Sequence, residues 1–158
     1  MFVKKPITVS KFRDNADEYK KRQLGETVSA DYAIKEDDEH YDDLARQYWR
    51  KLGPTQEPSM YGADMSGSLF EGAEASGWNV DRLNTCLQLL RADLDDGGDE
   101  DCVAMPGVTS AYLYFGQWAS VFAAHTEDMN LLSINYLHAG EPKYWYAISP
   151  TDSDRFER

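Results

Sequence analysis

The sequence predicts a mainly β domain with flanking helices. Its second half contains four runs rich in aromatic and β-branched residues, separated by short polar or glycine- and proline-containing breaks, which is typical of consecutive strands. Its first half contains runs whose apolar side chains recur at helical spacing. With 158 residues the chain is long enough for one domain with its own core. We therefore expect helices first and a sheet after them.

Three helices are predicted before residue 95. The first covers residues 7–23, "ITVSKFRDNADEYKKRQ", where Thr8 and Ser10 are candidate caps. The second, "YDDLARQYWRKL" at 41–52, follows a polar, acidic loop and stops at a Gly-Pro pair. The third is "VDRLNTCLQLLRADL" at 80–94, which Asn79 can cap and which carries a stripe of leucines.

The extended segments begin with "MYGADMSGSLF" at 60–70, where Gly62 and Gly67 indicate that the backbone bends or approaches something closely. From Ser110 onward the spacing of apolar residues changes to that of strands. A last charged run, "SPTDSDRFER", contains the Ser and Asp of a helix start. The four clear strand predictions cover residues 111–118, 120–128, 131–140 and 143–149.

The net charge of -12 disfavours nucleic-acid binding through the chain's own surface, because neutralising phosphates requires clustered Lys and Arg. A basic protein or peptide is an easier partner, but the charge alone favours the simpler interpretation of a solvated acidic surface. The two cysteines suggest neither a disulfide framework nor a zinc site, which fits a reducing, intracellular location. No signal-peptide core or membrane-length apolar run is present.

A histidine and a glutamate two positions apart, His125 and Glu127, are candidate metal ligands. On a strand, residues at i and i+2 point to the same side, and a 2-His-1-carboxylate triad binds non-haem Fe(II). Asn135 and Lys143 follow on the next extended segments and suit a small dicarboxylate, one end of which would chelate iron. Taken singly, each of these residues is also compatible with an exposed strand, an edge-strand hydrogen bond or a surface lysine.

The run "AYLYFGQWASVFAAHTEDMNLLSINYLHAGEPKYWYAISP" closely resembles the catalytic core of the JmjC (Jumonji-C) histone lysine demethylases. The resemblance extends to "YGADMSGSLF", "WNVDRLNTCLQLL", "YDDLARQYWRKL" and, more loosely, "PITVSKFRDNADEY", and so covers nearly the whole chain. The combination is similar to the JmjN/JmjC subfamily that acts on trimethylated lysine nine and lysine thirty-six of histone H3. It implies a double-stranded β-helix, a cupin-like jelly roll, in a nuclear chromatin regulator.

The resemblance implies a role for each candidate residue of the iron site. His125 and Glu127 match two Fe(II) ligands. Tyr61 and Lys143 match positions that hold the distal carboxylate of 2-oxoglutarate, and Asn135 matches a further position that holds this cosubstrate. For His125, Glu127, Asn135 and Lys143 these implied roles agree with the metal and dicarboxylate sites that their positions predict.

The resemblance also implies the walls of the two pockets. Phe122 and Trp145 match aromatic walls of the cosubstrate pocket. Tyr114 and the backbone of Gly107 match a methylammonium pocket in which oxygens surround the cation of a methylated histone H3 tail. The implied reaction uses O2 and 2-oxoglutarate to hydroxylate an N-methyl group, which leaves as formaldehyde. Because no nitrogen lone pair is needed, a trimethylated lysine is a possible substrate.

We expect the JmjC core to be incomplete in this chain. The family's third iron ligand comes from a later strand, and neither His40 nor His138 matches it. A jelly roll needs about eight strands, whereas four are clear here. The JmjN domain and the family's zinc site are also not found. We expect residues 1–53 to be a helical linker and 54–158 the N-terminal part of a JmjC domain, truncated before the third ligand and inactive alone.

Two other functions remain open at this point. A catalytically inactive JmjC fragment or chromatin-binding scaffold would keep the histone-facing Tyr114 region without iron. A JmjC-type protein hydroxylase is the second alternative, and the "YLYFG" and "GEPKYWYAI" runs favour demethylation over it. Ala124 and Ala139 replace aromatic residues of the family, which affects the choice of histone site more than the iron chemistry.

Overall fold

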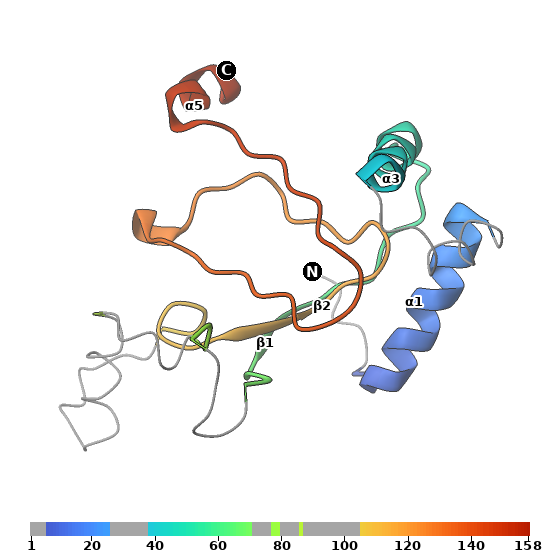
Figure 1. Cartoon of the computed structure of the whole chain (residues 1–158), viewed down its shortest axis with the longest axis horizontal. Helices are drawn as coiled ribbons and strands as arrows, with labels where there is room; N and C mark the ends of the chain where they lie inside the picture. Colours follow the sequence, from blue (N-terminus) through green and yellow to red (C-terminus); the bar gives the residue numbers. More distant parts are fainter. Residues whose placement is uncertain (1–5, 26–37, 71–76, 80–85, 87–104) are drawn as a thin grey trace.

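The computed structural model describes residues 6–25, 38–70, 77–79, 86 and 105–158 (Figure 1). Along these ranges the chain forms two longer helices, a pair of short strands and a helical turn at the C-terminus. The helix predicted at 80–94 and the acidic loop that follows it lie outside the described residues, except for Cys86, which is helical.

Helix α1 (Val9–Leu24) begins and ends as the sequence predicts. The Thr8 side chain accepts a hydrogen bond from the backbone N–H of Lys11 at 3.2 Å, which satisfies one of the unpaired donors of the first turn. Gly25 ends the helix with φ 87°, a conformation that glycine adopts without steric cost. Tyr19 and Leu24 are its buried side chains.

Helix α3 (Asp38–Lys51) confirms the second helix prediction. Leu44 is its buried apolar side chain, with 7% of its surface exposed. Arg50 and Lys51 occupy the last turn, where cations are favoured by the helix dipole. The Lys51 ammonium donates to the carbonyl oxygen of Gln23, which ties the end of α3 to the end of α1.

The sheet consists of strands β1 (Gly62–Ser66) and β2 (Tyr112–Phe115), which pair antiparallel. Gly62 pairs with Phe115 and Ser66 with Tyr112, and an irregularity interrupts the register between Gly62 and Met65. Asp64 sits in this bulge at φ 55°. The bend predicted in the segment 60–70 is therefore present, and the first of the four clear strand predictions is confirmed for its central residues.

The other three strand predictions, 120–128, 131–140 and 143–149, are wrong within the described residues. These segments follow wide loops between β2 and the C-terminal turn (orange to red in Figure 1). A strand exists only when its backbone pairs with a neighbouring strand, and these segments have no such ladder with the described residues. Their apolar side chains are correspondingly exposed, with Leu132 completely so.

The C-terminal prediction of a helix start is confirmed. A 3-10 turn, η3 (Pro150–Asp152), leads directly into the short helix α5 (Ser153–Phe156). The hydroxyl of Ser149 accepts from the backbone N–H of Thr151 and caps the turn. No helix among the described ranges is long and apolar enough to cross a bilayer.

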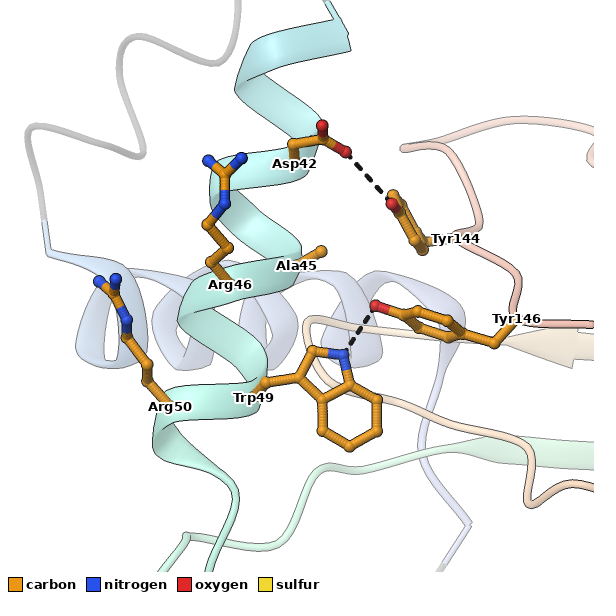
Figure 2. Close-up of a pocket in the computed structure, with 7 residues that line it drawn as sticks. All are labelled: Asp42, Ala45, Arg46, Trp49, Arg50, Tyr144 and Tyr146. Atoms are coloured by element: carbon orange, nitrogen blue, oxygen red, sulfur yellow. Dashed lines mark hydrogen bonds between the residues drawn. The ribbon is translucent and has the colours of Figure 1, made fainter. Parts of the chain in front are cut away.

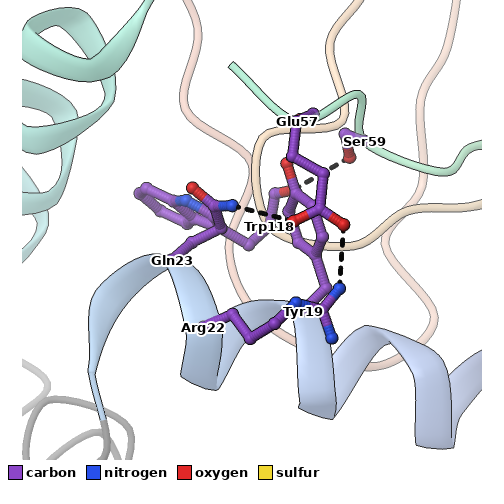
Figure 3. Close-up of polar contacts among 6 residues, drawn as sticks. All are labelled: Tyr19, Arg22, Gln23, Glu57, Ser59 and Trp118. Carbon is purple, nitrogen blue, oxygen red and sulfur yellow. Dashed lines mark hydrogen bonds and ion pairs between the residues drawn. The ribbon is translucent and has the colours of Figure 1, made fainter. Parts of the chain in front are cut away.

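Glu57 joins α1 to the segment that leads into β1 (Figure 3). The Tyr19 hydroxyl donates to the Glu57 carbonyl oxygen at 2.7 Å. Arg22 and Gln23 donate to the Glu57 carboxylate at 3.0 and 3.2 Å. Ser59 then donates to the carbonyl oxygen of Trp118 at 2.9 Å, so α1, the β1 segment and the chain after β2 are held together.

Candidate functional site

Phe122 lies at the centre of a cluster that contains most of the predicted site residues. Its ring centroid is 5.3 Å from that of Tyr61, 5.3 Å from that of Tyr114 and 6.3 Å from the His125 ring. The Lys143 ammonium lies 5.6 Å from the same centroid, within the range of a cation–π contact. The structure therefore brings together side chains from the β1 segment, from β2 and from the loops after β2.

Lys143 and Asn135 form a polar pair beside Phe122. The Lys143 ammonium donates a hydrogen bond to Oδ1 of Asn135 at 2.8 Å. Burial lowers the pKa of this ammonium below its usual value, yet no carboxylate is paired with it in the described residues. A partly desolvated cation next to an amide is a suitable site for a carboxylate ligand.

Two tyrosines and an aspartate form the other side of the cluster. The Tyr114 hydroxyl donates to Oδ1 of Asp64 at 3.0 Å. Burial, and next the hydrogen bond with Asp64, raise the pKa of Tyr114 to about 12. Burial, followed by the Asp64 charge, likewise raises the pKa of Tyr61 to about 12. Both phenols therefore stay protonated at neutral pH, and Tyr61 retains a hydrogen to donate.

His125 presents one ring nitrogen for a ligand. Its Nδ1 atom lies 2.6 Å from the carbonyl oxygen of Ala123, and because a carbonyl can only accept, Nδ1 carries the hydrogen. The lone pair is then on Nε2, which is the arrangement of metal-binding histidines whose other nitrogen is fixed by a hydrogen bond. Glu127 has extended backbone angles and an exposed carboxylate immediately before the short turn η2 (Asp128–Asn130).

The chemistry of His125 and Glu127 fits two positions of an Fe(II) site. Imidazole nitrogen and carboxylate oxygen are the donors of a 2-His-1-carboxylate triad. Among the residues that the structure describes, no group of three or more His, Cys, Asp or Glu side chains is close enough to hold a metal ion. The bend at Ala124 replaces the strand on which the two side chains were expected to share a face.

Two predicted site residues lie apart from this cluster. The Trp145 side chain is 61% exposed and makes no contact with the Phe122 ring. Gly107 has φ 82°, and a Cβ atom there would lie 2.6 Å from Cε2 of Tyr112, so Gly107 packs closely against the Tyr112 ring. The tight packing gives a reason for glycine at this position.

Asp64 is a site residue that the sequence analysis did not identify. Its carboxylate accepts the hydrogen bond from Tyr114, and its backbone lies in the β1 bulge at positive φ. The nearby glycines indicate an irregular strand, but nothing in the sequence specifies which side chain the irregularity aims at the tyrosine.

Comparison with known proteins places this site in a family. The model described as "JmjC domain, hydroxylase" matches residues 112–158, which include seven of the nine predicted site residues, all but Tyr61 and Gly107. The comparison with solved structures gave no significant match.

Curated relatives match a larger part of the chain. Lysine-specific demethylase 4B of Mus musculus is 48% identical over 119 residues, which is 75% of this chain and 10% of the relative. Lysine-specific demethylase 4D of Rattus norvegicus is 47% identical over 74% of this chain and 21% of the relative. Probable lysine-specific demethylase 4F of Homo sapiens is 48% identical over 75% and 17%.

The chain spans about a tenth to a fifth of the length of these relatives. These relatives are 47–48% identical to the chain over about three quarters of its length. The chain therefore belongs to the JmjC family, alongside the lysine-specific demethylase 4 proteins that it matches.

Proposed function

We propose that this chain supplies part of the active site of an Fe(II)- and 2-oxoglutarate-dependent histone lysine demethylase. The observation that carries the proposal is the convergence of Tyr61, Asn135 and Lys143 around Phe122. The names of the relatives support the same activity. The proposed setting is chromatin in the nucleus, where methylated histone tails are found.

Tyr61, Asn135 and Lys143 would hold 2-oxoglutarate. The Lys143 ammonium would pair with the distal carboxylate, and the protonated Tyr61 phenol would donate a hydrogen bond to it. Asn135 now holds the ammonium at 2.8 Å and would keep it oriented toward the ligand. Phe122 would form an apolar wall, and Trp145 is proposed as a second one.

His125 and Glu127 would hold Fe(II) through Nε2 and the carboxylate. The Ala123 carbonyl fixes the tautomer that leaves Nε2 free. When bound, iron with 2-oxoglutarate and O2 supplies the oxidation that removes an N-methyl group as formaldehyde. The third protein ligand is proposed to come from the remainder of the full-length protein, because the relatives are five to ten times longer than the matched segment.

A methylated lysine of histone H3 is the proposed substrate, with trimethylated lysine nine and lysine thirty-six as the candidate positions. Tyr114 and Asp64 provide oxygen atoms 3.0 Å apart, and oxygens with partial negative charge suit a methylammonium ion. The backbone of Gly107 is proposed to provide another. The net charge of -12 also favours a basic peptide over nucleic acid.

The proposed architecture is a JmjC jelly roll of which residues 54–158 are the N-terminal part and residues 1–53 a helical linker. The family match at 112–158 and the antiparallel pair β1–β2 support this assignment. Segments 120–128, 131–140 and 143–149 are proposed to gain strand partners from the rest of the domain. Their exposed apolar side chains are what such pairing would cover.

Formaldehyde release tests the proposal. The full-length protein is incubated with Fe(II), 2-oxoglutarate and a histone H3 peptide carrying a trimethylated lysine, beside the 158-residue chain alone. We expect release from the full-length protein only, and none when His125 is replaced by Ala. Peptide binding without release would favour a chromatin-binding scaffold, and succinate formation with hydroxylation of another side chain would favour a protein hydroxylase. Either result contradicts demethylation.

A further inference from the structure

Helix α3 contacts the segment that directly follows Lys143 (Figure 2). Two tyrosines of that segment, Tyr144 and Tyr146, point toward α3. The Tyr144 hydroxyl donates to Oδ1 of Asp42 at 3.2 Å. The Trp49 indole N–H donates to the Tyr146 hydroxyl oxygen at 2.7 Å.

Lys143 and the two tyrosines therefore form their bonds with different parts of the protein. Lys143 reaches Asn135 and the Phe122 ring, whereas Tyr144 and Tyr146 reach α3. Because Tyr144 and Tyr146 follow Lys143 directly along the chain, a displacement of either tyrosine also moves the backbone that carries the lysine.

The contact between α3 and the tyrosines depends on hydrogen bonds more than on close packing. A cavity of about 450 Å³ lies between them, lined by Ala45, Arg46 and Arg50 together with the bonded residues. Trp49 is 53% exposed and Tyr146 62% exposed. Their rings meet edge to face with centroids 5.6 Å apart. The two hydroxyl bonds are thus the specific links between the helix and the segment.

Helix α3 itself is well anchored. Leu44 is buried, and Lys51 is bonded to the end of α1. By contrast, segment 131–149 has no backbone ladder with the described residues. A fixed helix is therefore bonded to a segment that needs external support.

We propose that Asp42 and Trp49 are positioning residues for Lys143, holding its backbone through Tyr144 and Tyr146 so that the ammonium stays where the dicarboxylate cosubstrate binds. This inference rests on the proposed function for its ligand, but the positioning itself is a property of the protein alone. Neither α3 residue touches the cosubstrate site.

The experiment uses the full-length protein and four variants that remove single bonds. Trp49→Phe removes the indole N–H, Tyr146→Phe and Tyr144→Phe remove the hydroxyls, and Asp42→Ala removes the acceptor. Asp42→Asn keeps an acceptor oxygen and is the conservative rescue. Gln47→Ala is the matched control, because Gln47 lies on α3 outside the cavity lining.

Two readouts are measured on each protein. The first is cosubstrate binding. Calorimetry gives the dissociation constant of an unreactive 2-oxoglutarate analogue, and steady-state kinetics shows whether a variant changes KM for 2-oxoglutarate or kcat. The second, with no ligand present, is the rate at which an amine reagent modifies Lys143, relative to the exposed Lys11, measured by mass spectrometry. Loss of one exposed hydrogen bond should change the equilibrium constant that depends on it by roughly threefold.

We expect Trp49→Phe, Asp42→Ala and both tyrosine variants to bind the analogue about threefold more weakly, through KM with kcat little changed. Lys143 should be modified faster in these proteins, whereas Asp42→Asn and Gln47→Ala behave as the unmutated protein. Combining Trp49→Phe with Tyr146→Phe should weaken analogue binding no further than either substitution alone.

Unchanged Lys143 modification in all four variants overturns the positioning role. Absence of analogue binding by the unmutated protein overturns the proposed function, and the modification rates still decide the positioning.

Discussion

The Lys143 ammonium and the Asn135 amide oxygen lie 2.8 Å apart, although eight residues separate them in the chain. The pair lies at the edge of an aromatic cluster, where burial lowers the pKa of the ammonium. The electrostatic attraction of a carboxylate ligand is stronger for a partly desolvated ammonium that is paired only with a neutral amide than for a solvated lysine. This relationship is the basis of the proposed cosubstrate site.

Replacing Lys143 with Ala should raise KM for 2-oxoglutarate in the full-length protein by roughly tenfold or more, since a hydrogen bond to a charged group contributes about 1.5–3 kcal/mol. Lys143→Arg should recover part of the loss because it keeps the charge. Lys11→Ala, a change on the exposed face of α1, should leave KM unaltered. Steady-state kinetics with varied 2-oxoglutarate measures the effect, and equal KM for Lys143→Ala and Lys11→Ala would contradict the assignment.

The two site phenols should make stability fall at alkaline pH. Tyr61 and Tyr114 have pKa values of about 12 when folded, against about 10 when unfolded. The folded state therefore holds these protons more tightly, so their contribution to stability is complete below pH 10 and is lost between about pH 10 and 12. Urea unfolding of the chain at a series of pH values measures this decline.

The control for this pH dependence is the pair of phenylalanine variants. Tyr61→Phe and Tyr114→Phe should each flatten the decline in stability above pH 10, because the group that titrates late is gone. In absorbance titrations of the folded chain, each variant should lose phenolate signal that develops near pH 12. Loss of signal near pH 10 instead would show that the tyrosine is not buried as described.

The contact of Tyr19 with Glu57 should matter more for stability than the charges at the same place. Tyr19 is 3% exposed and its hydroxyl bonds the Glu57 carbonyl oxygen, so Tyr19→Phe should cost about 1 kcal/mol. Glu57→Gln alters only exposed bonds to Arg22 and Gln23 and should cost less than about 0.5 kcal/mol. Urea midpoints of the two variants give the comparison, and the reverse order would be inconsistent with this contact.

Gly107 should tolerate a side chain less well than Gly25. Both have positive φ, so alanine strains the backbone by roughly 1 kcal/mol at either position. At Gly107 the new Cβ would also collide with Tyr112, whereas at Gly25 nothing lies within 4 Å. Gly107→Ala should therefore be the more destabilising by about 1 kcal/mol or more in thermal or urea unfolding. Equal losses would mean that Tyr112 moves freely.

Local sequence features predicted the elements that depend on local interactions. Thr8 caps α1, the 41–52 run lies within α3 except for its last residue, and the aromatic run after Ser110 contains β2. The three later strands were wrong because strand formation depends on a partner elsewhere in space, which a run of apolar residues cannot specify.

For the site, the motif identified residues that the structure gathers around Phe122, but not the contacts that support them. Trp49 and Tyr146 are 97 residues apart, and Asp42 and Tyr144 are 102 residues apart. Such contacts follow from the packing of α3, not from any local pattern. Asp64 was likewise missed because a bulge determines where its carboxylate points.

The most direct test of the proposed site is the visible charge-transfer band that forms when 2-oxoglutarate chelates Fe(II). It is measured without oxygen on the full-length protein, on His125→Ala and Glu127→Ala, and on Lys143→Ala. We expect a band that requires both iron and 2-oxoglutarate, that is lost in the His125 and Glu127 variants, and that needs more 2-oxoglutarate to appear in the Lys143 variant. A band of unchanged intensity and 2-oxoglutarate dependence in all three variants would contradict the site.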